Sequence, residues 1–281
     1  MLSALQPNFV GIGHVSFDVI VGPNGRAAAP EPGGAAMFGA RTAAGLSLNA
    51  GVITAAHDDY PFGRVGRGVP VRQRRTAHTT TFEATHDGRH RRHRLVASAG
   101  PMTEADVPPD WSRPEVLLAA PLAGELPPGC AEWFESQISC AIAQGWMRRW
   151  REDGEEFIEP SPPPGLAGLD IVVVSDAEVP DELIPAWRST CQVLAVTRGE
   201  AGVSIFEGDR RIDVAGFPAE VVDTTGAGDV WAAAFAIRLL ETGETEHSAR
   251  FANAAASLSV EKVGLSGIPT RGDIEQRLGG L

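Results

Sequence analysis

The chain has 281 residues, of which 43% are apolar, so it is long enough to bury one large core. Its formal net charge of −12, with no concentrated basic tail, argues against nucleic-acid binding. No uninterrupted apolar run reaches about 18 residues, which predicts no membrane span, and residues 1–8 do not resemble a secretory signal.

Cysteine and lysine are both scarce. Cys130, Cys140 and Cys191 are widely spaced and fit neither a metal-ligand pattern nor a disulfide framework, which predicts a cytoplasmic, reducing environment. The single lysine, Lys262, lies outside any Gly-Lys-Ser/Thr string, so no Walker A loop is present. Any phosphate bound here must therefore be held by backbone amides and arginines.

The N-terminal third alternates strands with a helix. Residues 8–13 read as a short buried strand, and residues 15–21 alternate apolar with polar or small residues, as in a second strand. A dinucleotide fingerprint is rejected because Ser16 stands where its next glycine is required. A loop over 30–34, a helix over 35–45 and a strand over 49–55 follow, and this rhythm predicts a parallel sheet.

Residues 76–98 have a different character. Two strand-like stretches flank the turn His86-Asp87-Gly88, and their polar, basic positions predict a hairpin outside the main sheet. Arginines also crowd this part of the chain. They form either a solvated surface or a patch that attracts anionic substrates, and the sequence leaves both readings open. These arginines are Arg64, Arg67, Arg72, Arg74, Arg75, Arg89, Arg91, Arg92 and Arg94.

The remainder of the chain continues the strand and helix rhythm. Short apolar strands are predicted over 116–120, 139–143, 170–175 and 192–197, and a hairpin over 203–207 and 211–215. Helices are predicted over 230–241, 247–261 and 273–278. The pattern indicates one α/β domain with a largely parallel sheet.

The string Asp223-Thr224-Thr225-Gly226-Ala227-Gly228-Asp229 carries the chemistry. Two glycines and an alanine let the backbone approach a ligand, and the helix that follows leaves its first N–H groups without partners. The helix dipole adds partial positive charge, so this segment suits a phosphoryl group in transfer. A carboxylate at Asp229 can accept the proton of an attacking hydroxyl.

This string resembles the C-terminal signature of the ribokinase-like, or PfkB family, carbohydrate kinases. The resemblance implies that Asp229 is the catalytic base and that Gly226, Ala227 and Gly228 form an anion hole. It also implies that Thr225 binds nucleotide and that Asp223 organises the loop, with magnesium or a monovalent cation nearby.

Other segments resemble the same family in the same order. Asp18 and the pair Gly33-Gly34 match its substrate-binding positions, and Thr197, Gly199 and Gly202 match its nucleotide loop. Asn253 matches an asparagine that flanks the adenine. The segment Gln144-Gly145-Trp146-Met147-Arg148 is also similar to segments of members of this group.

Several positions depart from the family. Where many members carry Asn-x-x-Glu, this chain has Ser175-Asp176-Ala177-Glu178, which keeps Glu178 for magnesium but loses the asparagine. Ala35 and Phe38 occupy places where ribose kinases have a lysine and an asparagine, which argues against ribose. The glycine pair and Ser-Asp-x-Glu are more similar to myo-inositol kinase-like members.

The combined expectation is a three-layer ribokinase-like fold. Residues 1–281 are expected to form a single kinase domain, with β lid segments at about 14–32 and 70–98. The expected activity is ATP- and Mg²⁺-dependent phosphorylation of a sugar or polyol, with a monovalent cation as a further candidate cofactor and a homodimer formed through the lid. A nucleoside kinase, with Phe17 and Phe38 contacting the base, and a non-catalytic sugar or nucleotide sensor are the alternatives.

Overall fold

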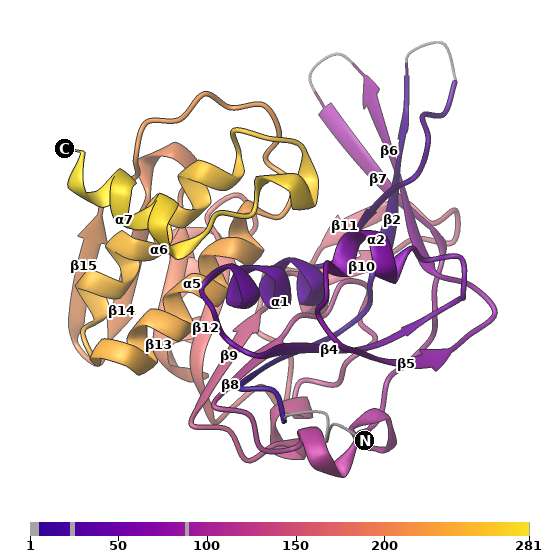
Figure 1. Cartoon of the computed structure of the whole chain (residues 1–281). Coiled ribbons are helices and arrows are strands. Elements are labelled where there is room, and N and C mark those ends of the chain that lie inside the picture. The colour runs from indigo at the N-terminus through magenta and orange to yellow at the C-terminus, as the bar shows by residue number, and fades with distance from the viewer. Residues whose placement is uncertain (1–5, 23–25, 88–89, 281) are drawn as a thin grey trace.

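A nine-stranded sheet runs through the centre of the computed structural model, which describes residues 6–22, 26–87 and 90–280 (Figure 1). The strand order is β15-β14-β13-β12-β9-β8-β1-β4-β5, and all neighbours are parallel except β13-β14 and β14-β15. The strands are β1 (Phe9–Ile12), β4 (Ala50–Ala56), β5 (Val71–Arg75), β8 (Val116–Ala119), β9 (Ile138–Ile142), β12 (Leu169–Ser175), β13 (Cys191–Thr197), β14 (Val203–Glu207) and β15 (Arg210–Val214). This confirms the predicted, mostly parallel α/β fold.

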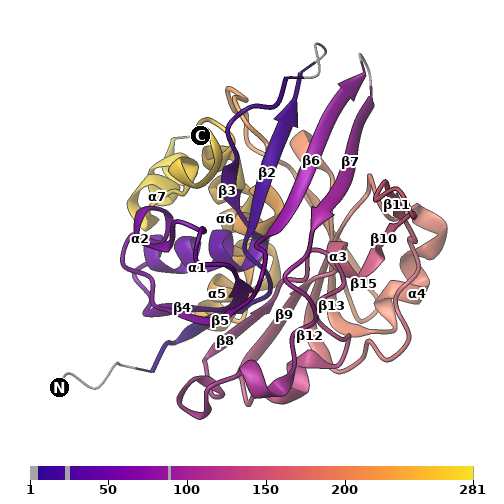
Figure 2. The same ribbon diagram turned by 90° about the vertical axis from the view of Figure 1, so that its right-hand side faces the viewer.

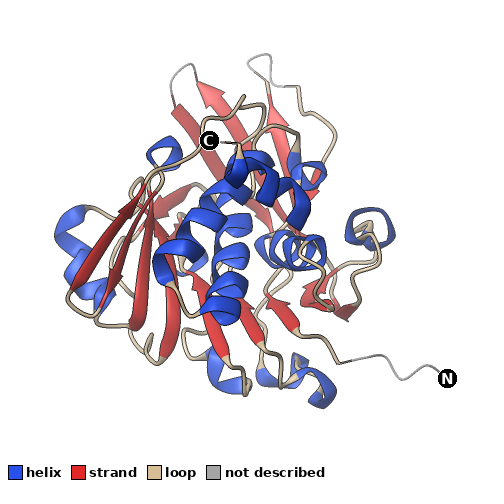
Figure 3. Cartoon of the chain, turned by 60° about the vertical axis from the view of Figure 1, so that its left-hand side comes forward, coloured by secondary structure: helices blue, strands red, loops and turns tan. Residues whose placement is uncertain are grey.

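Both faces of this sheet are buried because alternate residues of each strand enter different cores. On β12, Ile171 and Val173 pack on one side, and Val172 and Val174 pack on the other. The first core is covered by the long helices α1 (Ala35–Gly45), α5 (Ala227–Thr242) and α6 (Thr245–Ser259), with α7 (Arg271–Gly279) outside them (Figure 3). The second is covered by the short helices α3 (Gln144–Met147) and α4 (Ile184–Arg188).

A smaller, four-stranded sheet projects from the main body (Figure 2). Its order is β3 (Glu31–Gly33), β2 (Ser16–Val21), β6 (Thr80–Asp87) and β7 (His90–Ala97). Residues 71–75 had been expected in this sheet, but they form β5 and pair in parallel with β4 at the edge of the main sheet. Part of the predicted turn at 86–88 lies outside the described residues, since Gly88 is not described.

The chain changes its direction across the main sheet beside β1. The chain proceeds from β1 through β4 to β5 on one side, then returns to β8, β9 and β12 on the other. Ligands of open α/β sheets bind at the carboxyl ends of strands near such a reversal. The segment from Gly13 to Asp18 leaves β1 at this point.

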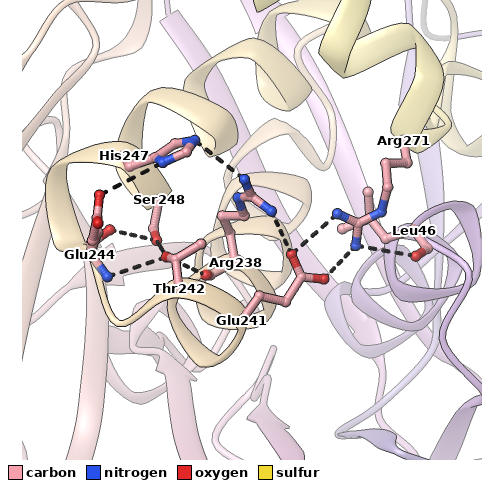
Figure 4. Close-up of polar contacts among 8 residues, drawn as sticks. All are labelled: Leu46, Arg238, Glu241, Thr242, Glu244, His247, Ser248 and Arg271. Atoms are coloured by element: carbon pink, nitrogen blue, oxygen red, sulfur yellow. Dashed lines mark hydrogen bonds and ion pairs between the residues drawn. The ribbon is translucent and has the colours of Figure 1, made fainter.

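The C-terminal helices are tied together by a network of ion pairs (Figure 4). Glu241, in the last turn of α5, pairs with Arg238 of the same helix at 2.8 Å and with Arg271 at the start of α7. Arg271 also donates to the Leu46 carbonyl just after α1, at 3.4 Å. The far end of α5 is therefore anchored to two neighbouring elements.

Most of the described arginines between Arg64 and Arg94 have acidic partners. Arg72 pairs with Asp110 at 3.1 Å, Arg74 with Asp106 at 2.7 Å, and Arg94 with Glu83 at 3.3 Å. These pairs favour the reading of a solvated, charge-balanced surface. Arg89 lies outside the described residues, as do the side chains of Arg91 and Arg92. Among the described helices, none combines the length and apolar character needed to cross a membrane.

Candidate active site

The glycine-rich string predicted to carry the chemistry forms the entry to α5. Gly226 is the residue before the helix and has φ of +79°, a left-handed conformation that glycine adopts without strain. The Ala227 N–H donates to the Thr224 carbonyl at 3.2 Å, which closes the turn. A side chain at Gly228 would meet no atom within 4 Å, so this residue faces open space. The first turn of α5 thus presents backbone N–H groups to a cavity.

Asp229 is the third residue of α5 and has a strongly perturbed carboxyl group. Burial raises its pKa to about 7, the nearby charge of Arg148 lowers it, and those of Asp18 and Glu178 raise it further. A carboxylate with a pKa near neutrality is matched to accepting a proton from a hydroxyl group. The geometry and the electrostatics of Asp229 therefore both suit a general base.

A cavity of about 760 Å³ lies in front of this helix terminus. Its lining includes the carboxyl groups of Asp229 and Glu178, the glycines Gly226 and Gly228, and a set of apolar side chains. The apolar wall comes from the segment after β15 and from α6, through Phe217, Pro218, Ala219, Val221, Ala256 and Val260. Thr197, Gly199 and Gly202, predicted from the sequence, also line this cavity.

Asn253, another predicted nucleotide-binding residue, lines the cavity from α6 but is buried and fully engaged. Its side-chain NH₂ donates to the Val214 and Ala215 carbonyls, both at 3.0 Å, and its oxygen accepts from Trp231 Nε1 at 2.7 Å. Both N–H donors of the amide are therefore used inside the protein. Asn253 fixes the cavity wall by joining α6, α5 and the end of β15.

The predicted acceptor-side residues lie on the second sheet and on the turn into α1. Asp18 is on β2, opposite Glu31 of β3, and a side chain placed on Gly33 would approach its Oδ2 to 3.5 Å. The Gly33 carbonyl accepts from the Tyr60 hydroxyl at 2.8 Å. Gly34, with φ of +112°, precedes α1 and packs so tightly that a Cβ would lie 2.6 Å from the Val15 Cα. The charge of Asp18 raises the pKa of Asp229.

Glu178, the predicted magnesium residue, also lines the cavity. It accepts a hydrogen bond from the Gln144 side chain, and burial raises its pKa. Within residues 6–22, 26–87 and 90–280, no group of three or more His, Cys, Asp or Glu side chains forms a metal cluster. A single carboxylate in this position is compatible with Mg²⁺, which keeps several waters and binds few protein ligands.

The side chain of Asp223 bonds to two backbone N–H groups in and near the loop. The Asp223 carboxylate accepts the Thr225 N–H and the Gly264 N–H, both at 2.9 Å. This arrangement supports the loop-organising role that the sequence indicates for Asp223. Thr224 lines the cavity, whereas Thr225, the predicted nucleotide-binding residue, is not among its lining residues.

Arg148 is a site residue to which the sequence reasoning assigned no role. It follows α3 directly, four residues after Gln144, and its charge lowers the pKa of both Asp229 and Glu178. Two signals were available in the sequence: the position of the segment Gln144–Arg148 just after the buried strand β9, and the similarity of this segment to members of the PfkB family. Its partners come from distant segments, which spacing alone does not reveal.

Comparison with known proteins supports the family resemblance. Residues 166–271, which contain the glycine loop and Asp229, match the pfkB family carbohydrate kinase. A ribokinase of Bacillus subtilis (strain 168) is 48% identical over 86 residues, covering 30% of this chain and 29% of the relative. The chain therefore spans less than a third of the length of this curated relative.

Two solved structures extend the likeness to nearly the whole chain. A pyrophosphate-dependent myo-inositol-1 kinase converted into a myo-inositol-3 kinase has a TM-score of 0.79 and 25% identity, covering 97% of this chain and 98% of its own. The ribokinase of Arabidopsis thaliana, complexed with ribose and ATP, has a TM-score of 0.74 and 21% identity, covering 98% and 99%. The fold is therefore ribokinase-like, and the resemblance to PfkB family kinases is confirmed.

Proposed function

We propose that this chain transfers a phosphoryl group to a hydroxyl of a small sugar or polyol, as a carbohydrate kinase. The observation that carries the proposal is Asp229, whose pKa is raised to about 7 beside the N–H groups that begin α5. A base next to an anion site is what phosphoryl transfer to an alcohol requires.

The proposed donor is ATP. The phosphates would lie near Gly226, Gly228 and Thr197, where backbone N–H groups at the start of α5 offset their charge. The base would lie against the apolar wall of Phe217, Ala256 and Val260, and the volume of about 760 Å³ is within the usual range for such ligands. Pyrophosphate is the second candidate donor, because the myo-inositol kinase with the TM-score of 0.79 uses it.

The proposed acceptor lies between Asp18, the Gly33-Gly34 backbone and Asp229. In the proposed mechanism, Asp229 removes the proton as the hydroxyl attacks the terminal phosphorus in line. The N–H groups of Gly226, Ala227 and Gly228 then stabilise the charge on the transferring group. When bound, Mg²⁺ would neutralise phosphate charge, and Glu178, which lines the cavity, would help to hold it. Asp223 is proposed to keep the loop in shape, and Thr225 to contribute through that loop.

The second sheet is proposed to act as a lid that excludes water, which would otherwise compete as acceptor. Ile20 and Val96, which are 45% and 53% exposed on this sheet, support the further proposal of a homodimer formed there. We also propose a cytoplasmic location, because the three widely spaced cysteines do not fit a disulfide framework.

A nucleoside acceptor is the second candidate function within the same fold. It was expected to use Phe17 and Phe38 against the base. Phe38 is 2% exposed and packs on Gly226, and the Phe17 ring contacts Tyr60 with a centroid separation of 5.5 Å. The buried ring of Phe38 therefore offers no open face to a base, which favours the sugar or polyol acceptor. A non-catalytic sensor would not need a carboxyl group whose pKa is raised to near neutrality, as that of Asp229 is.

The test is a transfer assay with Mg²⁺ and either ATP or pyrophosphate, against myo-inositol, ribose, fructose and adenosine. We expect transfer to one sugar or polyol, and a fall in kcat of about 10²- to 10⁴-fold in Asp229→Asn. An Asp229→Asn variant that retains the kcat of the parent chain would contradict the mechanism. Binding of ATP without transfer to any acceptor would favour the sensor.

A further inference from the structure

This inference rests on the proposed function and concerns how the second sheet is joined to the reaction centre. A short hairpin of β10 (Arg148–Trp150) and β11 (Glu156–Ile158) lies beside β7, the edge strand of that sheet (Figure 2). The Leu95 N–H donates to the Gly154 carbonyl at 3.0 Å, and Arg94 forms a β-bridge with Glu155. The hairpin therefore attaches the second sheet to the main body.

Three charged or polar side chains form a continuous row of contacts across this junction. His93 Nδ1 of β7 lies 2.9 Å from Glu156 Oε2 of β11, and Glu156 Oε1 lies 2.6 Å from Arg148 Nε of β10. The side chains of His93, Glu156 and Arg148 are 25%, 14% and 12% exposed, so water screens these contacts only weakly. Burial raises the pKa of Glu156. The hydrogen bond from His93 and the charges of Arg148 and His93 lower it by more, so the pKa of Glu156 is below its ordinary value.

The guanidinium of Arg148 is held from three directions. Its centre lies 5.4 Å from the ring centroid of Phe82 on β6, and Nη1 donates to the Leu122 carbonyl at 3.3 Å. Phe82 in turn stacks on Trp150, with ring centroids 5.7 Å apart. Among these contacts, only the one with Glu156 is an ion pair. The other oxygen of the Glu156 carboxylate, Oε2, contacts His93.

The segment that carries Arg148 is linked to the candidate active site through Gln144. Gln144, on the helix that leads into Arg148, binds Glu178, and Glu178 and Asp229 line the same cavity. The charged groups that act on Asp229 are Arg148 from β10, Asp18 from β2 and Glu178 from the segment after β12. Arg148 is the only cation among these three.

We propose that Glu156, held by His93 of β7, is a positioning residue that fixes the Arg148 guanidinium beside Asp229, so that the docking of the second sheet controls the charge presented to the base. Neither His93 nor Glu156 touches the substrate in this proposal. They act through Arg148.

The test compares Glu156→Gln with Arg148→Gln and with Glu159→Gln as the matched control. Glu159 pairs with Arg149 at 2.8 Å on the same hairpin, but both side chains are more exposed. The readout is the titration of the Asp229 carboxyl carbon by NMR, followed alongside the pH profile of kcat. The NMR titration does not depend on activity, so it separates failure of this proposal from failure of the proposed function.

The direction of the shift decides the outcome. If Glu156 positions Arg148, Glu156→Gln raises the Asp229 pKa by about one unit, in the same direction as Arg148→Gln, and the double variant adds little. If Glu156 acted only as a negative charge, its removal would lower the Asp229 pKa. A lowered or unchanged pKa in folded Glu156→Gln overturns the proposal.

His93→Asn provides a second test should Glu156→Gln fold poorly. It removes the imidazole that holds Glu156 but keeps the Arg148–Glu156 pair, so we expect a smaller rise in the Asp229 pKa. We also expect kcat to fall severalfold while the KM for the donor changes by less than about twofold. An unchanged Asp229 pKa in a well-folded His93→Asn would remove β7 from the proposed chain of contacts.

Discussion

The ring of Phe38 on α1 lies directly against Gly226 at the entry to α5. A Cβ placed on Gly226 would lie 2.3 Å from two atoms of that ring, and Gly226 also has φ of +79°. The first helix of the chain thus sets the shape of a loop that lies almost 190 residues later in the sequence. Phe38 occupies the place where ribose kinases are expected to have a polar, substrate-binding residue.

Gly226→Ala is expected to abolish most of the activity. The methyl group would collide with Phe38 and strain the left-handed backbone, so the N–H groups at the start of α5 would turn away from the phosphate. We expect kcat to fall about 100-fold or more, since misplacement by about 1 Å has this effect. Gly243→Ala is the matched control: it has φ of +67° but no atom within 4 Å, so it should lose only stability.

The pH profile of kcat should report the ionisation of Asp229. The carboxylate form is the base, and the pKa of this group is raised to about 7. Activity is therefore expected to rise with pH, with a midpoint near 7, and to level off above it. Arg148→Gln should move this midpoint to higher pH, because the charge of Arg148 favours the carboxylate. A profile that is flat between pH 5 and about 8 would be incompatible with Asp229 as the base.

Asp229→Asn should also change how stability depends on pH. The folded pKa of Asp229 lies above the value of about 3.9 for a free aspartate, so the stability it contributes is complete below about pH 4 and is lost as pH rises through about 7. The neutral asparagine does not incur this loss. Thermal unfolding should show a higher Tm for the variant at pH 8, with the difference closing toward pH 4. Asp209→Asn, on the exposed turn between β14 and β15, makes the same chemical change outside the cavity and is the control.

Glu241→Gln should weaken the network that anchors α5 (Figure 4). Burial raises the pKa of Glu241, but hydrogen bonds from Arg271 and Arg238 outweigh this and lower it below the ordinary value. Its contribution is present above the unfolded pKa of about 4.3 and is lost as pH falls through the folded pKa. At pH 7 we expect a loss of about 1 kcal/mol in urea unfolding. Glu244→Gln, whose side chain is 72% exposed, is the control and should cost less.

Asn253→Leu should weaken donor binding rather than the chemical step. The variant loses the acceptor for Trp231 Nε1 and both bonds to the end of β15, so the cavity wall loosens. We expect the KM for the donor to rise about tenfold and kcat to change by less than about twofold. Glu275→Gln on the exposed face of α7 serves as the control. A fall in kcat with unchanged KM would place Asn253 in catalysis instead.

Much of the fold could be predicted because the strands of the main sheet are buried on both faces and read as apolar runs. Val71–Arg75 was misassigned for the opposite reason. This edge strand carries arginines that reach solvent, so its pattern resembles the polar hairpin that follows it. The pairing of β5 with β4 is a tertiary interaction, which the local sequence pattern does not specify.

The site divides in the same way. The string from Asp223 to Asp229 was predictable, because loop and base are contiguous in sequence and their chemistry is local. The chain of His93, Glu156 and Arg148 was not, because its members come from different strands and meet only through the docking of β7 on the β10–β11 hairpin. Asn253 lines the cavity, but its hydrogen bonds with Val214, Ala215 and Trp231 join segments that are far apart in the sequence and could not be predicted from it.

The placement of Asp18 on the second sheet bears on how such an enzyme diversifies. The residues that line the donor cavity lie between Ile142 and Val260, whereas Asp18 and Gly33 lie near the start of the chain. The family match, over residues 166–271, falls on the donor half. On the proposed assignment, mutations in the N-terminal stretch can exchange one acceptor for another while the inherited transfer machinery stays as it was.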